Sequence, residues 1–283
     1  MVFTDLDGTL LDNHHELSFI NRQTLRRLGN NGVFRVVITG RSLASASGVL
    51  DSDFPIDILV TSSGAGIYSF PEKILLRSSV IDRNHVRKYI ELLKTMDLDF
   101  MVHFPVPDNH LFSWHRSLKK NGDFDRRLNA YRGQHSPLRI DANHIGEAAQ
   151  LLVICPQDKN SEIHISLQKN LSNSTIIRTT SPLDQKSIWY EIFPYGISKS
   201  SSAAWLCKQY DLDSKNALAI GNDYNDKDLL HWCRFSRIVE NAPASLKKHF
   251  TVVQDNNNNG FSQAVDEWLA HLKKDEITIT NYL

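Results

Sequence analysis

This 283-residue sequence has few cysteines, no surplus charge of either sign and no long apolar runs. Lys plus Arg and Asp plus Glu number 32 each, so the bulk electrostatic attraction of a nucleic-acid or membrane-surface protein is missing. The three cysteines, Cys155, Cys207 and Cys233, lie far apart without a CxxC pair. This pattern argues against a disulfide framework or a structural zinc site and favours a reducing compartment.

Membrane and export signals are also missing. No apolar run approaches the length of a membrane span, and no basic region followed by an apolar region opens the chain. The cytoplasm is therefore the expected location. The first strand has almost no lead-in before Asp5, which is compatible with a start inside a longer natural strand. The histidines show no HxH or HExxH spacing, so zinc is not expected.

Two aspartates end the first apolar run. Asp5 and Asp7 are spaced i, i+2, so in an extended strand both side chains project from one face. Gly8 permits a sharp turn directly after them. A hard cation such as Mg²⁺ would relieve the repulsion between two neighbouring carboxylates. A strand that simply ends in a polar turn is the alternative, and these residues alone leave the choice open.

Buried strands alternate with helices in the first and last parts of the chain. The runs 33–38 and 56–60 are β-branched and nearly all apolar, which is typical of strands in a parallel sheet. A helix is predicted over 42–50 between them. The same alternation returns with a helix over 198–210 and a strand over 217–220. This order predicts an α/β fold with a Rossmann-like parallel sheet core.

The middle of the chain has a different texture. A helix is predicted over 84–97 and strands over 100–104, 151–155 and 174–179, whereas 109–143 is polar, weakly patterned and rich in His and Arg. These elements predict an inserted α+β domain. The expected division is a core of residues 1–78 and 187–283 with a cap of residues 79–186, which places a predicted strand over 189–193 in the core.

Four sets of polar residues follow strands or start a helix in the predicted core. They are Asp5 with Asp7, Thr39-Gly40-Arg41, Lys199, and Gly221-Asn-Asp-Tyr-Asn-Asp226. The carboxyl ends of parallel strands share one sheet edge, where ligands bind, and this combination suits a phosphate with Mg²⁺. Taken alone, Thr39-Gly40-Arg41 is more often an ordinary strand-to-helix turn, and Lys199 a solvated helix-start residue.

Together these residues resemble the four motifs of the haloacid dehalogenase (HAD) superfamily of phosphatases. The long insert resembles the type C2B cap of its Cof-like type IIB branch, and the resemblance covers the whole chain. It implies that Asp5 is the nucleophile, which forms an aspartyl-phosphate, and that Asp7 is the acid and base. It also implies that Thr39, through its hydroxyl and backbone N–H, binds the phosphoryl group together with Lys199, next to Gly40 and Arg41.

The metal set implied by the resemblance is Asp5, the backbone carbonyl of Asp7, and the loop residues Asn222, Asp223 and Asp226. The family commonly has an aspartate where this chain has Asn222. An amide oxygen still ligates Mg²⁺ but brings no charge, so weaker binding is expected, and Asp223 could take its place. Asp226 is expected to support the site. Ser63 replaces an asparagine that is frequent in the family, and the run 256–259 is predicted to be a solvated loop.

The sequence thus predicts a Mg²⁺-dependent phosphomonoesterase acting on a small phosphorylated metabolite, with a sugar phosphate as the expected substrate. The cap would close over the crevice and contact the leaving group. A phosphomutase of hexose phosphates and a non-catalytic phosphate-binding protein are the alternatives. Specificity is expected to lie in the insert, and the identity of the substrate and the oligomeric state are left open.

Overall fold

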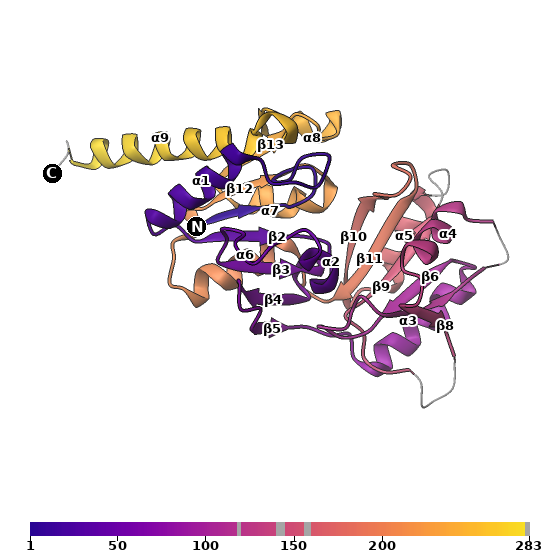
Figure 1. The fold of residues 1–283 in the computed structure, drawn as a ribbon. Coiled ribbons are helices and arrows are strands. Elements are labelled where there is room, and N and C mark those ends of the chain that lie inside the picture. Colours follow the sequence, from indigo (N-terminus) through magenta and orange to yellow (C-terminus); the bar gives the residue numbers. More distant parts are fainter. Residues whose placement is uncertain (118–119, 140–144, 156–159, 281–283) are drawn as a thin grey trace.

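A computed structural model describes residues 1–117, 120–139, 145–155 and 160–280. Two sheets form two lobes (Figure 1). The eight strands of the first sheet lie in the order β14-β13-β12-β1-β2-β3-β4-β5, of which β14 to β3 pair in parallel. Their bounds are β1 Val2–Thr4, β2 Arg35–Ile38, β3 Ile58–Thr61, β4 Gly66–Ser69, β5 Leu75–Ser78, β12 Leu218–Gly221, β13 Phe235–Val239 and β14 Thr251–Val253.

Helices cover both faces of this sheet, which explains why its strands are apolar without alternation. Val37 and Leu218 face one hydrophobic cluster, and their neighbours Val36 and Ala219 face the other. The first cluster includes α1 (Phe19–Asn30) and α9 (Gly260–Thr280), and the second α6 (Lys199–Gln209) and α7 (Lys227–Trp232). Two shorter helices complete the lobe, α2 (Leu43–Ser47) and α8 (Ala244–Lys247). The predicted α/β fold is confirmed.

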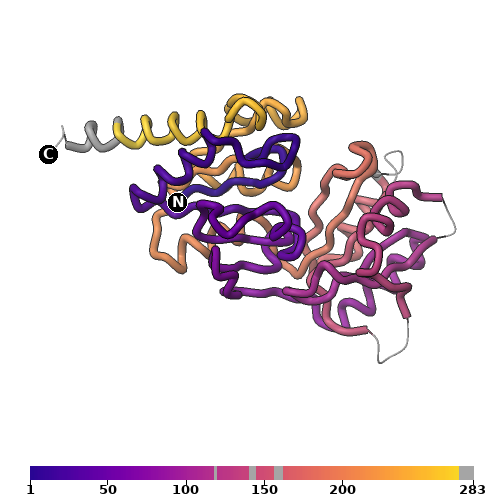
Figure 2. Tube along the Cα trace, viewed as in Figure 1, coloured from indigo at the N-terminus to yellow at the C-terminus, as the bar shows by residue number. Residues whose placement is uncertain are grey.

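The inserted lobe is built on a six-stranded sheet in the order β10-β11-β9-β6-β7-β8. Its bounds are β6 Phe100–His103, β7 Phe112–His115, β8 His135–Pro137, β9 Gln150–Cys155, β10 Ser174–Thr180 and β11 Ile188–Pro194, with α3 Arg83–Thr95, α4 Gly122–Ala130 and α5 Asn160–Asn170. Figure 2 shows the chain leaving the first sheet after β5 and returning after β11. We call this lobe the cap.

Two expectations need correction, and a region without a clear pattern contains regular elements. β11 was expected in the core, but it pairs with β10 and β9, so the chain returns to the core only after Pro194. The weakly patterned region 109–143 contains β7, α4 and β8 within its described part. Asn256 is buried and its side-chain amide donates to the carbonyl of Leu11 at 3.0 Å, so this residue departs from the solvated loop predicted over 256–259, whereas Asn257 and Asn258 are exposed.

The two faces of the cap sheet differ. Side chains alternate across a strand, so Phe100, Leu151 and Tyr190 point to the face that α3 and α5 cover. The opposite face, which we call the inner face, carries Met101, His103, Gln150, Leu152 and Glu191. Helix α4 packs over part of the inner face through Phe124.

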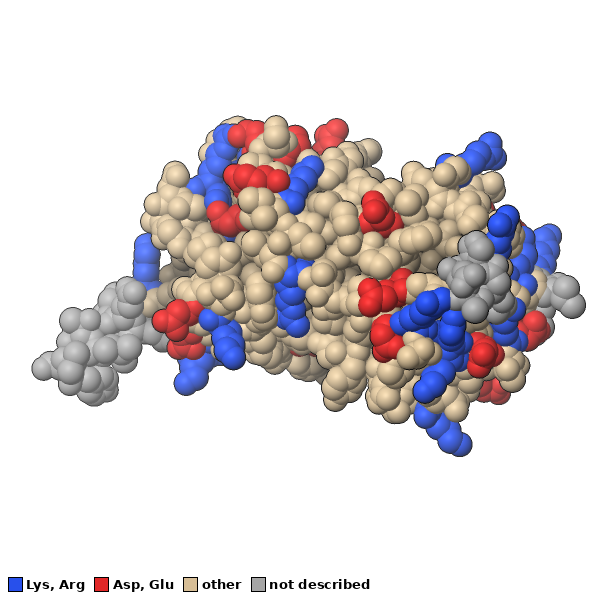
Figure 3. All heavy atoms as spheres, turned by 90° about the horizontal axis from the view of Figure 1, so that it is seen from below, with Lys and Arg blue, Asp and Glu red and all other residues tan. Residues whose placement is uncertain are grey.

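The surface matches the balanced composition. Figure 3 shows acidic and basic side chains interspersed on the face that it presents. No helix among the described residues is long and apolar enough to cross a membrane.

Candidate active site

Asp5, Lys199 and Asp226 meet at the carboxyl edge of the core sheet. Asp5 follows β1, and its backbone N–H donates to Ile220 at 2.9 Å. Lys199 is the first residue of α6, where a capping box between Ser198 and Ser201 fixes the start of the helix. Its Nζ donates to Asp5 Oδ1 at 2.5 Å and to Asp226 Oδ1 at 2.6 Å.

All three side chains are buried, which strengthens the electrostatic interactions between their charges. Burial raises the pKa of Asp5 to about 7; Lys199 opposes that rise and Asp226 adds to it. Burial alone would lower the pKa of Lys199, but the two carboxylates raise it above its ordinary value. Lys199 therefore remains an ammonium ion beside the predicted nucleophile.

Asp226 anchors the loop that follows β12. Its Oδ2 accepts the backbone N–H groups of Asn222 at 2.8 Å and Asp223 at 3.0 Å. Since Oδ1 accepts from Lys199, both oxygens of Asp226 have hydrogen-bond donors. Asp226 thus supports the site by positioning Lys199 and the loop.

Asp7 forms a two-point ion pair with Arg41. Arg41 Nε donates to Asp7 Oδ2 at 2.7 Å, and Nη2 donates to Asp7 Oδ1 at 2.6 Å. Asp7 is more open than Asp5, with 37% of its side chain exposed. Gly8 directs this turn: its φ is +70°, and a Cβ there would lie 2.6 Å from Asn222 Nδ2. Arg41 is therefore a local partner of Asp7 in this structure.

Thr39 presents its hydroxyl but not its backbone N–H to the edge. The N–H donates to Val60 at 2.9 Å in the sheet, so the expectation that this group binds a phosphoryl oxygen is wrong. The hydroxyl oxygen accepts from Arg41 N at 3.1 Å, which leaves its proton for an outside acceptor. Within the described residues, the N–H of Gly40 has no acceptor, so it is the better candidate for a second phosphoryl contact.

A family model for haloacid dehalogenase-like hydrolases matches residues 2–265. The chain belongs to this family. It is 22% identical over 272 residues to a 5-amino-6-(5-phospho-D-ribitylamino)uracil phosphatase of Bacillus subtilis, covering 95% of each chain. The fold is similar to that of a phosphatase of the superfamily from Bacteroides thetaiotaomicron, with a TM-score of 0.78, 20% identity and 94% of each chain covered.

A solved HAD subclass IIB sugar phosphatase gives a TM-score of 0.75 at 15% identity, covering 94% of this chain and 98% of that one. These likenesses confirm the HAD fold with its cap, and the chain is a phosphatase of the HAD family. The carboxyl edge of the core sheet, where Asp5, Lys199 and Asp226 meet, is therefore the candidate reaction centre.

The residues at this edge fit a hard divalent cation. Asp5 bonds Lys199 through Oδ1 and keeps its second carboxylate oxygen for a further ligand, and Asn222 lies beside the turn at Gly8 that follows Asp7. Asp223 Oδ1 is buried without a hydrogen-bond partner. Oxygen donors of this kind suit Mg²⁺. Among the described residues, no three His, Cys, Asp or Glu side chains are grouped so that they could hold a metal ion by themselves.

The cap brings residues to the edge that the sequence did not single out. Asn109 Nδ2 donates to Ser62 Oγ at 2.6 Å, which joins the cap to the loop after β3. Glu191 is buried on β11, close enough to Lys199 for an electrostatic interaction. Burial raises the pKa of Glu191 to about 7, against the influence of Arg127 and Lys199. The sequence contains one signal for Glu191, because a charged residue within the apolar run 188–193 is unusual.

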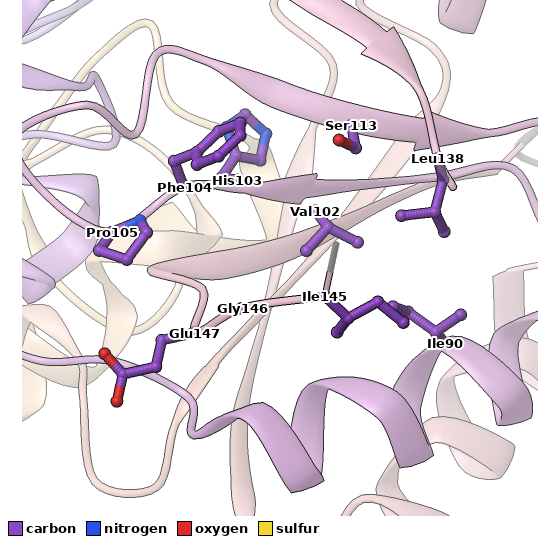
Figure 4. Close-up of a pocket in the computed structure, with 10 residues that line it drawn as sticks. All are labelled: Ile90, Val102, His103, Phe104, Pro105, Ser113, Leu138, Ile145, Gly146 and Glu147. Atoms are coloured by element: carbon purple, nitrogen blue, oxygen red, sulfur yellow. The ribbon is translucent and has the colours of Figure 1, made fainter. Parts of the chain in front are cut away.

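A cavity lies in the cap, away from Asp5, Lys199 and Asp226. It has a volume of about 230 Å³ and is lined by Ile90, Val102, Leu138, Ile145 and neighbouring residues of the cap. Figure 4 shows Ile90 on a helix and Val102 on a strand bordering it, together with Ile145 and Leu138. No residue of the reaction centre lines this cavity, so we do not assign the chemistry to it.

Proposed function

We propose that this chain is a Mg²⁺-dependent phosphomonoesterase that hydrolyses a small phosphorylated metabolite, with a sugar phosphate as the substrate class. The observation that supports it best is the position of Asp5. Its carboxylate is buried at the end of β1 and hydrogen-bonded to Lys199. Asp7, two residues later, is more exposed and is paired with Arg41 instead. Two carboxylates held in different environments suit separate roles as nucleophile and as acid and base.

In the first step Asp5 attacks the phosphorus atom, and the bond from phosphorus to the ester oxygen breaks. Asp7 gives its proton to the departing alcohol, which leaves as a neutral hydroxyl compound. In the second step Asp7 takes a proton from water, and the resulting hydroxide releases inorganic phosphate from Asp5. Arg41 holds both oxygens of Asp7, so it sets the direction of that carboxyl group.

The electrostatic part of the reaction falls to Lys199 and the Thr39 hydroxyl, which face the anionic phosphoryl group. Asp5, the Asp7 carbonyl and Asn222 or Asp223 would hold Mg²⁺, which supplies further positive charge when bound. The substrate class is supported by relatives whose names describe a phosphoribityl compound and a sugar as substrates.

Release of inorganic phosphate from a panel of sugar, sugar-alcohol and nucleoside phosphates tests the proposal. Hydrolysis should require Mg²⁺ and disappear with excess EDTA or in Asp5→Asn protein. Asp211→Asn, the same change at an exposed position, should behave as wild type. Turnover that persists in both EDTA and the Asp5→Asn variant would overturn the mechanism. Isomerised hexose phosphate without free phosphate would identify a mutase instead.

A further inference from the structure

Ser62 and Ser63, which follow β3, have a backbone conformation that is rare for buried side chains. Their φ angles are +46° and +53°, in the left-handed region that most L residues avoid. Among the described residues, every other non-glycine residue with positive φ is exposed or half-buried, whereas these two are at most 2% exposed. Such strain persists only where neighbouring contacts hold it, and it clusters at functional sites. We call Ser62, Ser63 and Gly64 the support turn.

The support turn binds two carbonyl groups of the segment Thr39-Gly40-Arg41. The backbone N–H of Ser63 donates to the carbonyl of Thr39 at 3.0 Å. The backbone N–H of Ser62 donates to the carbonyl of Arg41 at 2.8 Å. The two residues with positive φ are therefore the two that hold this segment.

The bond from Ser63 fixes the direction of the Gly40 N–H. The carbonyl and the N–H of one trans peptide unit point in opposite directions, and the unit between Thr39 and Gly40 is trans. Because its carbonyl is bound to Ser63, its N–H points away from the support turn. A Cβ built on Gly40 would meet only Ser63 Oγ, at 4.0 Å, apart from its chain neighbours. The Gly40 N–H thus stays uncovered within the described part of the chain.

Two other elements brace the support turn. Gly64 has a φ of +123°, and a Cβ there would collide with Ser202 Oγ near the start of α6, the helix that begins at Lys199. From the cap, Asn109 Nδ2 donates to Ser62 Oγ at 2.6 Å. The support turn is therefore held between α6, the cap and the segment that it binds, which explains how its strained conformation persists.

We propose that Ser62 and Ser63 are positioning residues for the phosphoryl group. By binding the carbonyls of Thr39 and Arg41, they fix the direction in which the Gly40 N–H meets a phosphoryl oxygen. A donor that is already fixed need not reorganise as charge develops. The role belongs to the backbone of the support turn, since the Ser63 hydroxyl is buried without a hydrogen-bond partner. This inference rests on the proposed function.

Two substitutions at Ser63 test the backbone conformation. Ser63→Gly is the conservative change for φ, because glycine adopts positive values freely, so the Kd of inorganic phosphate with Mg²⁺ should stay within about twofold of wild type. Ser63→Val places a β-branched side chain where φ is positive, and the Kd should rise about tenfold or more, as expected for a lost bond to a charged group. Ser52→Val makes the same change at an exposed position with an ordinary φ and is the control.

Calorimetric titration separates positioning from a general loss of folded protein. Unfolded protein lowers the number of binding sites and leaves their Kd unchanged, so the Kd reports the folded fraction alone. The affinity for Mg²⁺ without phosphate should be unchanged in all three variants, because the support turn holds the phosphoryl-binding segment and not the metal ligands. The kcat/KM for p-nitrophenyl phosphate should fall with the phosphate affinity in Ser63→Val.

A measurement on wild-type protein covers the case in which Ser63→Val does not fold. Labelling with ¹⁵N-glycine gives signals from 13 glycines, and the signal missing from Gly40→Ala protein is that of Gly40. Its order parameter should be about 0.85 before phosphate is added, as in rigid backbone. Its amide proton should move downfield when phosphate and Mg²⁺ are added, because a bond to an anion deshields it.

Several results would overturn the positioning role while the phosphatase chemistry stands. They are an unchanged phosphate Kd in folded Ser63→Val protein, a tenfold weaker Kd in Ser63→Gly, which would assign the role to the hydroxyl, and a Gly40 amide that is mobile or does not respond to phosphate. Absence of Mg²⁺-dependent phosphate release from the whole substrate panel overturns the proposed function, and the role of the support turn with it.

Discussion

The core and the cap bury polar residues in opposite ways. In the core, Lys199 donates to Asp5 and Asp226, and Asp226 accepts from three donors in all. On the inner face of the cap, Gln150 and Glu191 are equally buried but keep acceptor atoms without partners. Lys199 and Asp226 are thus bonded to each other without a ligand, whereas Gln150 and Glu191 have no partners for these acceptor atoms within the described part of the chain.

Under the proposed function, the bonded network of the core takes part in the chemical step. A charge network that is already bonded need not reorganise when phosphate arrives, which is how preorganised sites lower a barrier. A buried acceptor without a partner costs free energy, so replacing it by an apolar group need not destabilise the fold. The largest losses of stability should therefore follow changes in the core network, and the smallest should follow changes at Gln150 and Glu191 in the cap.

Lys199→Met should give the largest effect. It leaves Asp5 and Asp226 buried without their common cation, and breaking a buried ion pair costs about 3–5 kcal/mol in the free energy of unfolding. Turnover of p-nitrophenyl phosphate should fall about 10³-fold or more. Urea unfolding and steady-state kinetics measure both. Lys208→Met, at an exposed position of the same helix, is the control. A stability loss under about 1 kcal/mol would contradict the network.

Arg41→Met should lower kcat about tenfold, which corresponds to about 1.4 kcal/mol in the activation barrier. The variant frees Asp7 from its two-point contact, so the carboxyl group no longer holds one direction. KM should change little if Arg41 only positions Asp7. Arg22→Met removes a surface pair with Asp51 and serves as the control. A rise in KM with unchanged kcat would instead assign Arg41 to substrate binding.

Asn222→Asp should lower the Mg²⁺ concentration needed for half-maximal activity by about fivefold or more, because a carboxylate adds charge where the amide has none. Calorimetric titration of Mg²⁺ into the protein without substrate gives a readout independent of turnover. Asn216→Asp, an exposed position before β12, is the control. An unchanged Mg²⁺ affinity in both measurements would place the metal away from this side chain.

The sequence could predict the core site because its residues follow strands. Asp5, Thr39 and the loop after β12 each end a buried strand, and a parallel sheet brings those ends to one edge. Contacts that depend on the direction of a side chain could not be predicted from the sequence. Nothing local shows that Arg41 turns to Asp7, or that the Thr39 N–H is consumed by Val60.

The cap was harder for a physical reason. The apolar run of β11 suits a strand buried in either sheet, and only its antiparallel pairing with β10 and β9 decides between them. The sequence predicts that Asn256 is solvated, because a run of asparagines usually forms a solvated loop. In the structure this side chain is bonded to the carbonyl of Leu11, which is distant in the sequence. Arg127 lies in a stretch without clear periodicity, so its stacking on Trp189 depends on tertiary packing.

Gln150→Leu should give the smallest change in stability, and it tests the comparison most directly. The substitution removes a buried acceptor that has no partner and adds apolar surface beside Leu152, so the free energy of unfolding should stay within about 1 kcal/mol of wild type or rise. Urea unfolding without ligand measures it, with Gln168→Leu as the exposed control. A loss of about 2 kcal/mol or more would show that Gln150 is a structural residue whose oxygen is satisfied in solution.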